Sequence, residues 1–244
     1  MSKLFTVEAK LYLRDPVAPF FSLLLPVVLL LALGSIPTLR QVSPELGNMR
    51  PVDTYLPGMM SMLAVMTLAF TVLPAALTTY RESGVLRRMS TTPASPAKLL
   101  AVHLILIVLV SVLAIAAIVV AGYLVHDVAV PRNLPGFLLV FVLGSASLMA
   151  IGLIVAALAP SGKAAPGIGS AVMFPLMFVS GMWFPRETMP EWLQRIGDYL
   201  PAVPFGQAMR DTWAGSAPAV HDLVVMAITL VVASLVAARV FRWE

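Results

Sequence analysis

The residue types best suited to binding or catalysis are gathered in one polar stretch, YRESGVLRRMSTTPASPAKLL, which covers residues 80–100 between two long apolar runs. It holds four basic residues and one acid: Arg81, Arg87, Arg88, Lys98 and Glu82. Charges beside a short apolar stripe can dock a protein partner, because the apolar groups supply contact energy while the charges set orientation and association rate. A loop that only fixes the orientation of a membrane protein carries the same charges, so both interpretations are open at this point.

Several serines lie near glycines and could be taken for the nucleophiles of an intramembrane protease: Ser145, Ser147, Ser170 and Ser180. A nucleophilic serine needs a base within hydrogen-bonding distance. The histidine nearest the end of the chain, His221, lies at the edge of an apolar run. Close packing of helices through small residues explains the serines better, and an intramembrane serine protease is kept only as a minor alternative.

Neither a metal site nor a nucleotide site is expected in the chain. There are no cysteines, and the three histidines do not pair at metal-ligand spacing. The fragment most similar to a phosphate-binding loop, PSGKAAP at residues 160–166, lacks the first glycine and the Ser or Thr that should follow the lysine. We therefore expect no cofactor in this chain and do not expect it to be an enzyme.

The composition is that of a membrane protein. Of the 244 residues, 59% are hydrophobic and 11% are charged, whereas soluble domains have about 25% charged residues. The apolar residues also come in unbroken blocks rather than at the periods of half-buried helices or strands. Basic residues in such a chain mark the cytoplasmic ends of spans, so a nucleic-acid partner is not expected.

The positions of the apolar runs predict an all-α, polytopic fold with six transmembrane helices in a single domain, residues 1–244. A membrane span takes about 20 apolar residues, and the predicted spans are about 17–38, 56–79, 99–124, 135–159, 165–185 and 221–238. The remaining parts are an interfacial helix over 1–15, a loop over 80–98 and an outer segment over 186–220.

The basic residues predict the orientation of these spans, because they stay preferentially in the cytoplasm. With six spans, the side that holds both termini carries ten of the 16 basic residues and a net charge of +6, against −2 on the other side. Both termini are therefore expected in the cytoplasm. Leu4, Val7 and Leu11 lie at helical spacing and predict that the first helix rests on the inner leaflet.

The acidic residues bear on the mechanism of transport. Every Asp and Glu falls outside the six apolar runs, whereas secondary carriers usually hold a proton or cation on a carboxylate or histidine within the membrane. A carrier or channel that needs no ATPase is thus the weaker alternative to a transporter driven by a separate engine.

The segment between the fifth and sixth spans predicts two short amphipathic helices. Trp192, Ile196 and Tyr199 line one face of the first, and Phe205, Met209 and Trp213 repeat at four-residue spacing in the second. We expect both helices at the outer interface, with their aromatic rings at the level of the lipid headgroups.

Three stretches together resemble the ABC-2 type transporter permease, the membrane subunit of exporters that are driven by a separate ATP-binding subunit. They are LYLRDP at residues 11–16, the polar loop quoted above, and VSGMWFPRETMPEWLQRIGDYLPAVPFGQAMRDTW at residues 179–213. The resemblance covers essentially the whole chain, and it is greatest to the small drug and antibiotic efflux permeases.

The resemblance implies that the loop after the second span is a coupling helix that docks on the ATPase. Carried onto this sequence, the contacts would be Arg81, Glu82, Gly84, Leu86, Arg87 and Arg88, with Lys3, Glu8 and Arg14 as secondary contacts. It further implies two ABC ATP-binding subunits that hold ATP and Mg²⁺, a second permease copy (identical or paralogous) and a bacterial plasma-membrane location.

The resemblance also implies that the second and fifth spans line the substrate pathway. On those spans the candidate residues are Thr67, Phe70, Thr71, Pro74, Met173, Phe174, Met177 and Phe178. Such a wall is apolar and adaptable, with a few hydroxyls, so an amphipathic or lipophilic drug-like substrate is expected. Export of a lipid, a polysaccharide or a peptide by the same fold is an alternative.

Overall fold

The fold is known from a computed structural model, which describes residues 2–42, 49–85, 96–183, 186 and 189–240. Up to residue 85 the helical elements are α1 (Ser2–Arg14), α2 (Val17–Pro19), the π-helix η1 (Phe20–Leu24), α3 (Leu25–Gly34), the 3₁₀ turn η2 (Pro37–Arg40), α4 (Pro51–Thr67), the π-helix η4 (Leu68–Val72) and α5 (Leu73–Glu82). From residue 96 they are α7 (Pro96–His126), α8 (Leu134–Leu158), α9 (Ala165–Val179), α10 (Glu191–Gly197), α11 (Ala202–Ala214) and α12 (Val220–Val240). The predicted all-helical class is thus confirmed for the described residues.

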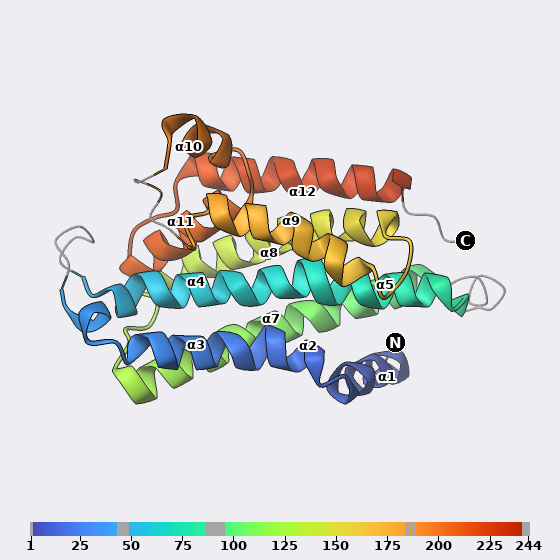
Figure 1. Cartoon of the computed structure of the whole chain (residues 1–244), viewed down its shortest axis with the longest axis horizontal. Coiled ribbons are helices and arrows are strands. Elements are labelled where there is room, and N and C mark those ends of the chain that lie inside the picture. Colours follow the sequence, from blue (N-terminus) through green and yellow to red (C-terminus); the bar gives the residue numbers. More distant parts are fainter. Residues whose placement is uncertain (1, 43–48, 86–95, 184–185, 187–188, 241–244) are drawn as a thin grey trace.

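Within the part of the chain that the structure describes, five helical segments are long and apolar enough to cross a membrane: Val17–Gly34, Pro51–Glu82, Lys98–His126, Leu134–Leu158 and Val220–Val240. The long helices run side by side along one axis, and α1 and the end of α12 lie toward the same end of the bundle (Figure 1). The segment formed by α4, η4 and α5 runs through the middle, with α3 and α7 on one side of it and α8 and α9 on the other (Figure 1).

The predicted fifth span, 165–185, is only partly helical. Helix α9 ends at Val179, and Ser180 and Gly181 form the turn that follows. Gly181 has a φ of 81°, which a residue with a side chain rarely adopts, so this glycine ends the helix within the apolar run. At 15 residues α9 is shorter than the other spanning candidates, and the six-span topology stays a prediction.

Each of the first two spans contains a π-helical turn just before a Leu-Pro pair. The N–H of Leu25 reaches back to the carbonyl of Phe20, and that of Leu73 reaches back to Leu68. Proline has no N–H to donate and its ring crowds the preceding turn. A wider turn accommodates the ring while the neighbouring backbone groups stay hydrogen-bonded, as a lipid environment requires.

The π-helix η4 lies between α8 and α9, and two glycines allow this close contact. A Cβ at Gly152 would overlap the carbonyl oxygen of Ala69, and one at Gly169 would overlap the carbonyl oxygen of Phe70. Both obstacles are backbone atoms, which cannot rotate away as a side chain can. These two glycines therefore bring η4 into direct backbone contact with α8 and α9.

The second of the two short helices is a core element, contrary to the expectation that its rings lie at headgroup level. Phe205 and Trp213 of α11 are 0% and 1% exposed, whereas Trp192 and Tyr199, in and just after α10, are exposed, and their placement at headgroup level stays a prediction. Helix α11 packs against α8 and α4, and Gly144 on α8 leaves room for the Phe205 ring. Four-residue spacing gave the correct face of α11 but not what covers it.

Candidate functional site

The charged end of α5 is attached to the end of α8. Arg81 donates hydrogen bonds to the carbonyl oxygens of Ala156 (3.2 Å) and Ala157 (2.8 Å), and also to that of Ala159. The last carbonyls of a helix have no partner within the helix and carry a partial negative charge, so a guanidinium stabilises them well. Arg81 thus acts as the C-terminal cap of α8.

The next residue holds the loop between α8 and α9. The Glu82 Oε2 atom accepts a hydrogen bond of 2.9 Å from the backbone N–H of Gly162. Gly162 lies so close to α5 that a Cβ there would overlap the hydroxyl of Thr79. We call Arg81 and Glu82 the α5 latch, because together they fix the end of α5 to the end of α8 and to the α8–α9 connection.

The remaining predicted coupling residues of this loop follow the latch directly. Ser83 ends α5, and Gly84 turns the chain with a φ of 68°. Leu86, Arg87 and Arg88 lie outside the described residues, so their contact with an ATPase stays a prediction. The structure therefore places the loop immediately after the residues that attach α5 to α8 and α9.

The secondary coupling residues on α1 divide into two groups. Lys3 and Arg14 are exposed. Glu8 is only 4% exposed, and its Oε2 accepts hydrogen bonds from the hydroxyl of Tyr80 (2.7 Å) and from Nδ1 of His103 (3.1 Å). The structure thus brings Glu8 next to the latch from within the bundle, while its contact with an ATPase stays a prediction.

Tyr80 and His103 were not singled out from the sequence as site residues, although one signal was available. On α1, Val7 and Leu11 form an exposed apolar stripe, and a second face made by Phe5, Glu8 and Ala9 packs on the bundle. Glu8 was the signal, because a carboxylate on the face of a helix that packs on the rest of a membrane protein needs a hydrogen-bond donor from another helix.

A cavity of about 400 Å³ lies between α1, the turn that follows it, and the second span. The lining residues are Glu8, Leu11, Tyr12, Asp15, Val17, Ala18, Phe21, Thr67, Thr71, Val72, Ala75, Ala76, Thr79, Tyr80, His103 and Pro166. Burial raises the pKa of the Tyr12 hydroxyl, which is hydrogen-bonded to Ser22 at 2.6 Å. We call this space the N-terminal cavity.

The predicted substrate-pathway residues occupy three different environments. Thr67 and Thr71 line the N-terminal cavity. The buried members lie in the helix core: Phe70, Pro74, Met173 and Met177. Phe174 and Phe178 are 54% and 42% exposed on the outer surface of α9, so a wall that includes all of these residues needs a second element opposite α9.

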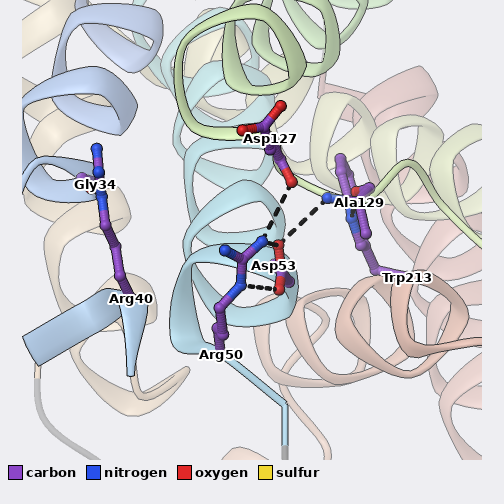
Figure 2. A network of polar contacts seen from close by, with 7 residues as sticks. All are labelled: Gly34, Arg40, Arg50, Asp53, Asp127, Ala129 and Trp213. Atoms are coloured by element: carbon purple, nitrogen blue, oxygen red, sulfur yellow. Dashed lines mark hydrogen bonds and ion pairs between the residues drawn. The ribbon is translucent and has the colours of Figure 1, made fainter. Parts of the chain in front are cut away.

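At the opposite end of the bundle a polar network joins α4, α11 and the α7–α8 connection (Figure 2). Arg50 pairs with Asp53 at 2.6 Å and donates to the carbonyl of Asp127 at 3.1 Å. Asp53 also accepts from the N–H of Ala129 at 3.3 Å, and the Ala129 carbonyl accepts from Nε1 of Trp213 at 2.6 Å. The hydrogen bond to Asp53 raises the pKa of the Arg50 guanidinium.

A second contact holds the adjoining end of α3. Arg40 donates to the carbonyl of Gly34 at 2.6 Å (Figure 2) and contacts Nδ1 of His126 at the end of α7. We call these two sets of contacts the outer network, made by Arg40, Arg50, Asp53, His126 and Trp213. It lies at the end of the bundle opposite the latch. Two of its contacts, Arg50–Asp53 and Arg40–Gly34, are local, whereas the others join residues 76 to 86 positions apart, which is too far for spacing to reveal them.

Two of the four serines considered as nucleophiles are engaged in local hydrogen bonds, while the hydroxyl of Ser145 is buried without a hydrogen-bond partner among the described residues. Ser147 donates to the carbonyl of Gly144 and Ser180 to that of Met177, both at 2.8 Å. His221 lies against the ring of Tyr199, with a centroid separation of 5.8 Å. Within the described parts of the chain, the arrangement thus pairs neither Ser147 nor Ser180 with a histidine base.

The chain is similar in sequence to known transport proteins. The chain is 23% identical to YvfS of Bacillus subtilis (strain 168), which is named as a transport permease, over 90% of this chain and 87% of that protein. It is 32% identical to the daunorubicin resistance ABC transporter permease protein DrrB1 of Streptomyces coeruleorubidus, over 67% of this chain and 58% of that protein. The family model described as ABC-2 type transporter matches residues 2–213. The chain is therefore an integral membrane protein that belongs to the ABC-2 type transporter family.

Proposed function

We propose that the chain is the transmembrane permease subunit of an ATP-driven exporter, which moves an amphipathic or lipophilic, drug-like compound out of the cytoplasm or the inner leaflet. Membership of the family supports the permease role. The relative named for daunorubicin resistance supports a drug-like substrate. The charge distribution of the loops supports six crossings with both termini in the cytoplasm of a bacterial cell.

The proposed complex has two permease copies and two ABC ATP-binding subunits. ATP and Mg²⁺ bind to those subunits, since the permease sequence has no phosphate-binding loop. The rings of Phe174 and Phe178 support a second permease copy, identical or paralogous, because large parts of both rings on this predicted pathway face are exposed in one copy. The permease itself carries out no hydrolysis and changes shape when the ATPase moves.

The α5 latch is the observation that best supports ATP-driven coupling. Any displacement of the loop after Gly84 pulls on the end of α5, and Arg81 and Glu82 connect that end to α8 and to the α8–α9 loop. Rigid helices carry such a displacement along their length, as packed interiors compress little. The latch would therefore move the second, fourth and fifth spans together.

Charge reversal in the loop tests the dock. We expect Arg87→Glu with Arg88→Glu to remove a stoichiometric ATP-hydrolysing subunit that copurifies with the wild-type chain from its native host in mild detergent. A basic pair at a docking surface is suited to acidic groups on the partner, and the reversed charges would repel such groups. Lys163→Glu, which reverses one exposed basic residue of the neighbouring loop, is the control and should keep the subunit bound. A wild-type chain that purifies alone and still exports in liposomes would refute the proposed complex.

Truncation of the exposed rings tests the pathway. Phe174→Ala with Phe178→Ala should change the export rates of different compounds to different extents, by more than about tenfold between the most and the least affected compound. The basal ATPase rate should stay unchanged. Large aromatic rings supply much of the contact area for an apolar ligand. The control is Leu158→Ala, a large and 65% exposed apolar residue outside the predicted pathway. An identical transport profile for the double variant and the wild type would show that the rings serve only packing.

A further inference from the structure

The N-terminal cavity contains a carboxylate that is largely removed from water. Glu8 is 4% exposed, and both of its hydrogen bonds, from Tyr80 and His103, end on the same oxygen, Oε2. Among the described residues its other oxygen, Oε1, has no hydrogen-bond partner. A carboxylate buried in this way is costly unless its remaining lone pairs are also satisfied, so the free oxygen is suited to accept a further donor.

A second lining side chain has an unused polar atom. His103 is 5% exposed, and its Nδ1 is committed to Glu8. Its Nε2 is buried without a partner in the part of the chain that the structure describes. Because the carboxylate accepts, Nδ1 carries the hydrogen, and in a neutral ring Nε2 is then an acceptor. Glu8 thus has capacity for a ligand that donates hydrogen bonds, and it lies beside a ring whose second nitrogen is buried and unsatisfied.

The charge of the lining favours a cation. Glu8 and Asp15 contribute two carboxylates, and the described lining includes no Lys or Arg. The rest of the wall is mostly apolar, with the rings of Tyr12, Phe21 and Tyr80 among the side chains that line it. Aromatic faces attract organic cations as well as apolar groups.

The remaining candidates for a cationic ligand fit the cavity less well. A metal ion needs several ligating groups at one point, and no group of three His, Asp or Glu side chains suited to a metal occurs among the described residues. A volume of about 400 Å³ is also far larger than an ion requires and falls in the usual range for small organic ligands, roughly 300–1,000 Å³.

We propose that the N-terminal cavity binds a protonated organic amine with an apolar body, whose ammonium group donates to Glu8 while the body packs against Phe21, Val72 and Ala76. This proposal rests on the proposed function, because it makes the cavity a place where an exported amphiphile first binds. Thr67 and Thr71, which belong to the predicted pathway, line the same cavity, so the bound compound would already contact the second span.

Binding of a fluorescent amine to the full chain tests the proposal without ATP or an ATPase. The probe is dansylcadaverine, a lipophilic primary amine, and the matched compound is dansylamide, which has the same fluorophore and no ammonium group. Both are titrated into lipid nanodiscs that contain the wild-type chain, and the signal of empty nanodiscs is subtracted. We expect saturable binding of dansylcadaverine at least tenfold tighter than that of dansylamide.

Two variants and one control locate the site. Glu8→Gln keeps the shape and an acceptor for Tyr80, and should weaken dansylcadaverine binding at least tenfold while leaving dansylamide unaffected. Glu191→Gln removes an exposed carboxylate far from the cavity and should bind like the wild type. Ala76→Leu, which fills the cavity, should weaken both compounds, and it provides the test if Glu8→Gln does not fold.

The proposal is overturned if the wild type binds both compounds equally, or if Glu8→Gln binds dansylcadaverine as tightly as the wild type does. Its failure is distinguishable from that of the proposed function. ATP-dependent export in the reconstituted complex can persist without amine binding in this cavity, and amine binding to the isolated chain can persist even if no ATPase partner is found.

Discussion

Gly169→Ala will remove most of the yield of correctly folded protein, whereas Gly167→Ala, two residues earlier on α9, will leave that yield unchanged. The added methyl group at 169 would overlap the carbonyl oxygen of Phe70, while at 167 it would meet no atom within 4 Å. Relief at 169 requires α9 to move away from η4, because neither backbone can rotate out of the way. Overpacking of this kind costs about 1–3 kcal/mol, occasionally more.

The comparison can be made in detergent by thermal unfolding together with the monodisperse yield. Alanine in place of glycine within a helix is favourable by roughly 0.5–1 kcal/mol when nothing obstructs it, so Gly167→Ala should unfold at the same or a slightly higher temperature. Equal unfolding temperatures for the two variants would mean that the contact between η4 and α9 does not exist in the membrane protein.

Arg81→Ala will separate ATP hydrolysis from export. The substitution removes the donors to three carbonyls at the end of α8, and hydrogen bonds from a charged group contribute about 1.5–3 kcal/mol each when buried. This guanidinium is half-buried, so we expect a total effect of about 2 kcal/mol. With the latch opened, the ATPase would still move the loop after Gly84, but α8 and α9 would no longer follow.

The ratio of compound exported to ATP hydrolysed can be measured with the reconstituted complex. We expect Arg81→Ala to lower this ratio by more than about tenfold relative to the wild type. Lys163→Ala is the matched control, since it removes one exposed positive charge from the loop that the latch holds. A variant that loses hydrolysis and export in the same proportion would argue for a purely structural cap. Arg81→Lys should restore little, because an ammonium group lacks the guanidinium fork that reaches several carbonyls.

Much of the fold could be predicted from the sequence because a bilayer imposes a simple rule on composition. Long runs without charges must be helices, and their positions agree with the helices of the structure to within a few residues at most ends. The exceptions come from local backbone geometry. Gly181 shortens the predicted fifth span, because a single positive φ ends a helix irrespective of how apolar the following residues are.

Less of the candidate site could be predicted, since periodicity shows which residues share a face but not what lies against it. The face of α11 that carries Phe205 and Trp213 was predicted, but its burial depends on Gly144 in another helix. Similarly, Glu8 was expected to face a protein partner, and only the arrangement of α1 against Tyr80 and His103 shows where its carboxylate points. Contacts between residues about 70 to 100 positions apart leave no local pattern.

The π-helix η4 sets the angular phase between the two ends of the second span. It accommodates one residue more than a regular turn, and each residue of an α-helix advances by about 100°. The residues of α5 are therefore rotated by roughly that angle from where a continuous helix begun at Pro51 would put them. Asp53 in the outer network and Arg81 in the latch each meet their partners in this phase. A one-residue insertion or deletion in η4 would keep the sequence of both ends intact and yet turn one of them away from everything it contacts.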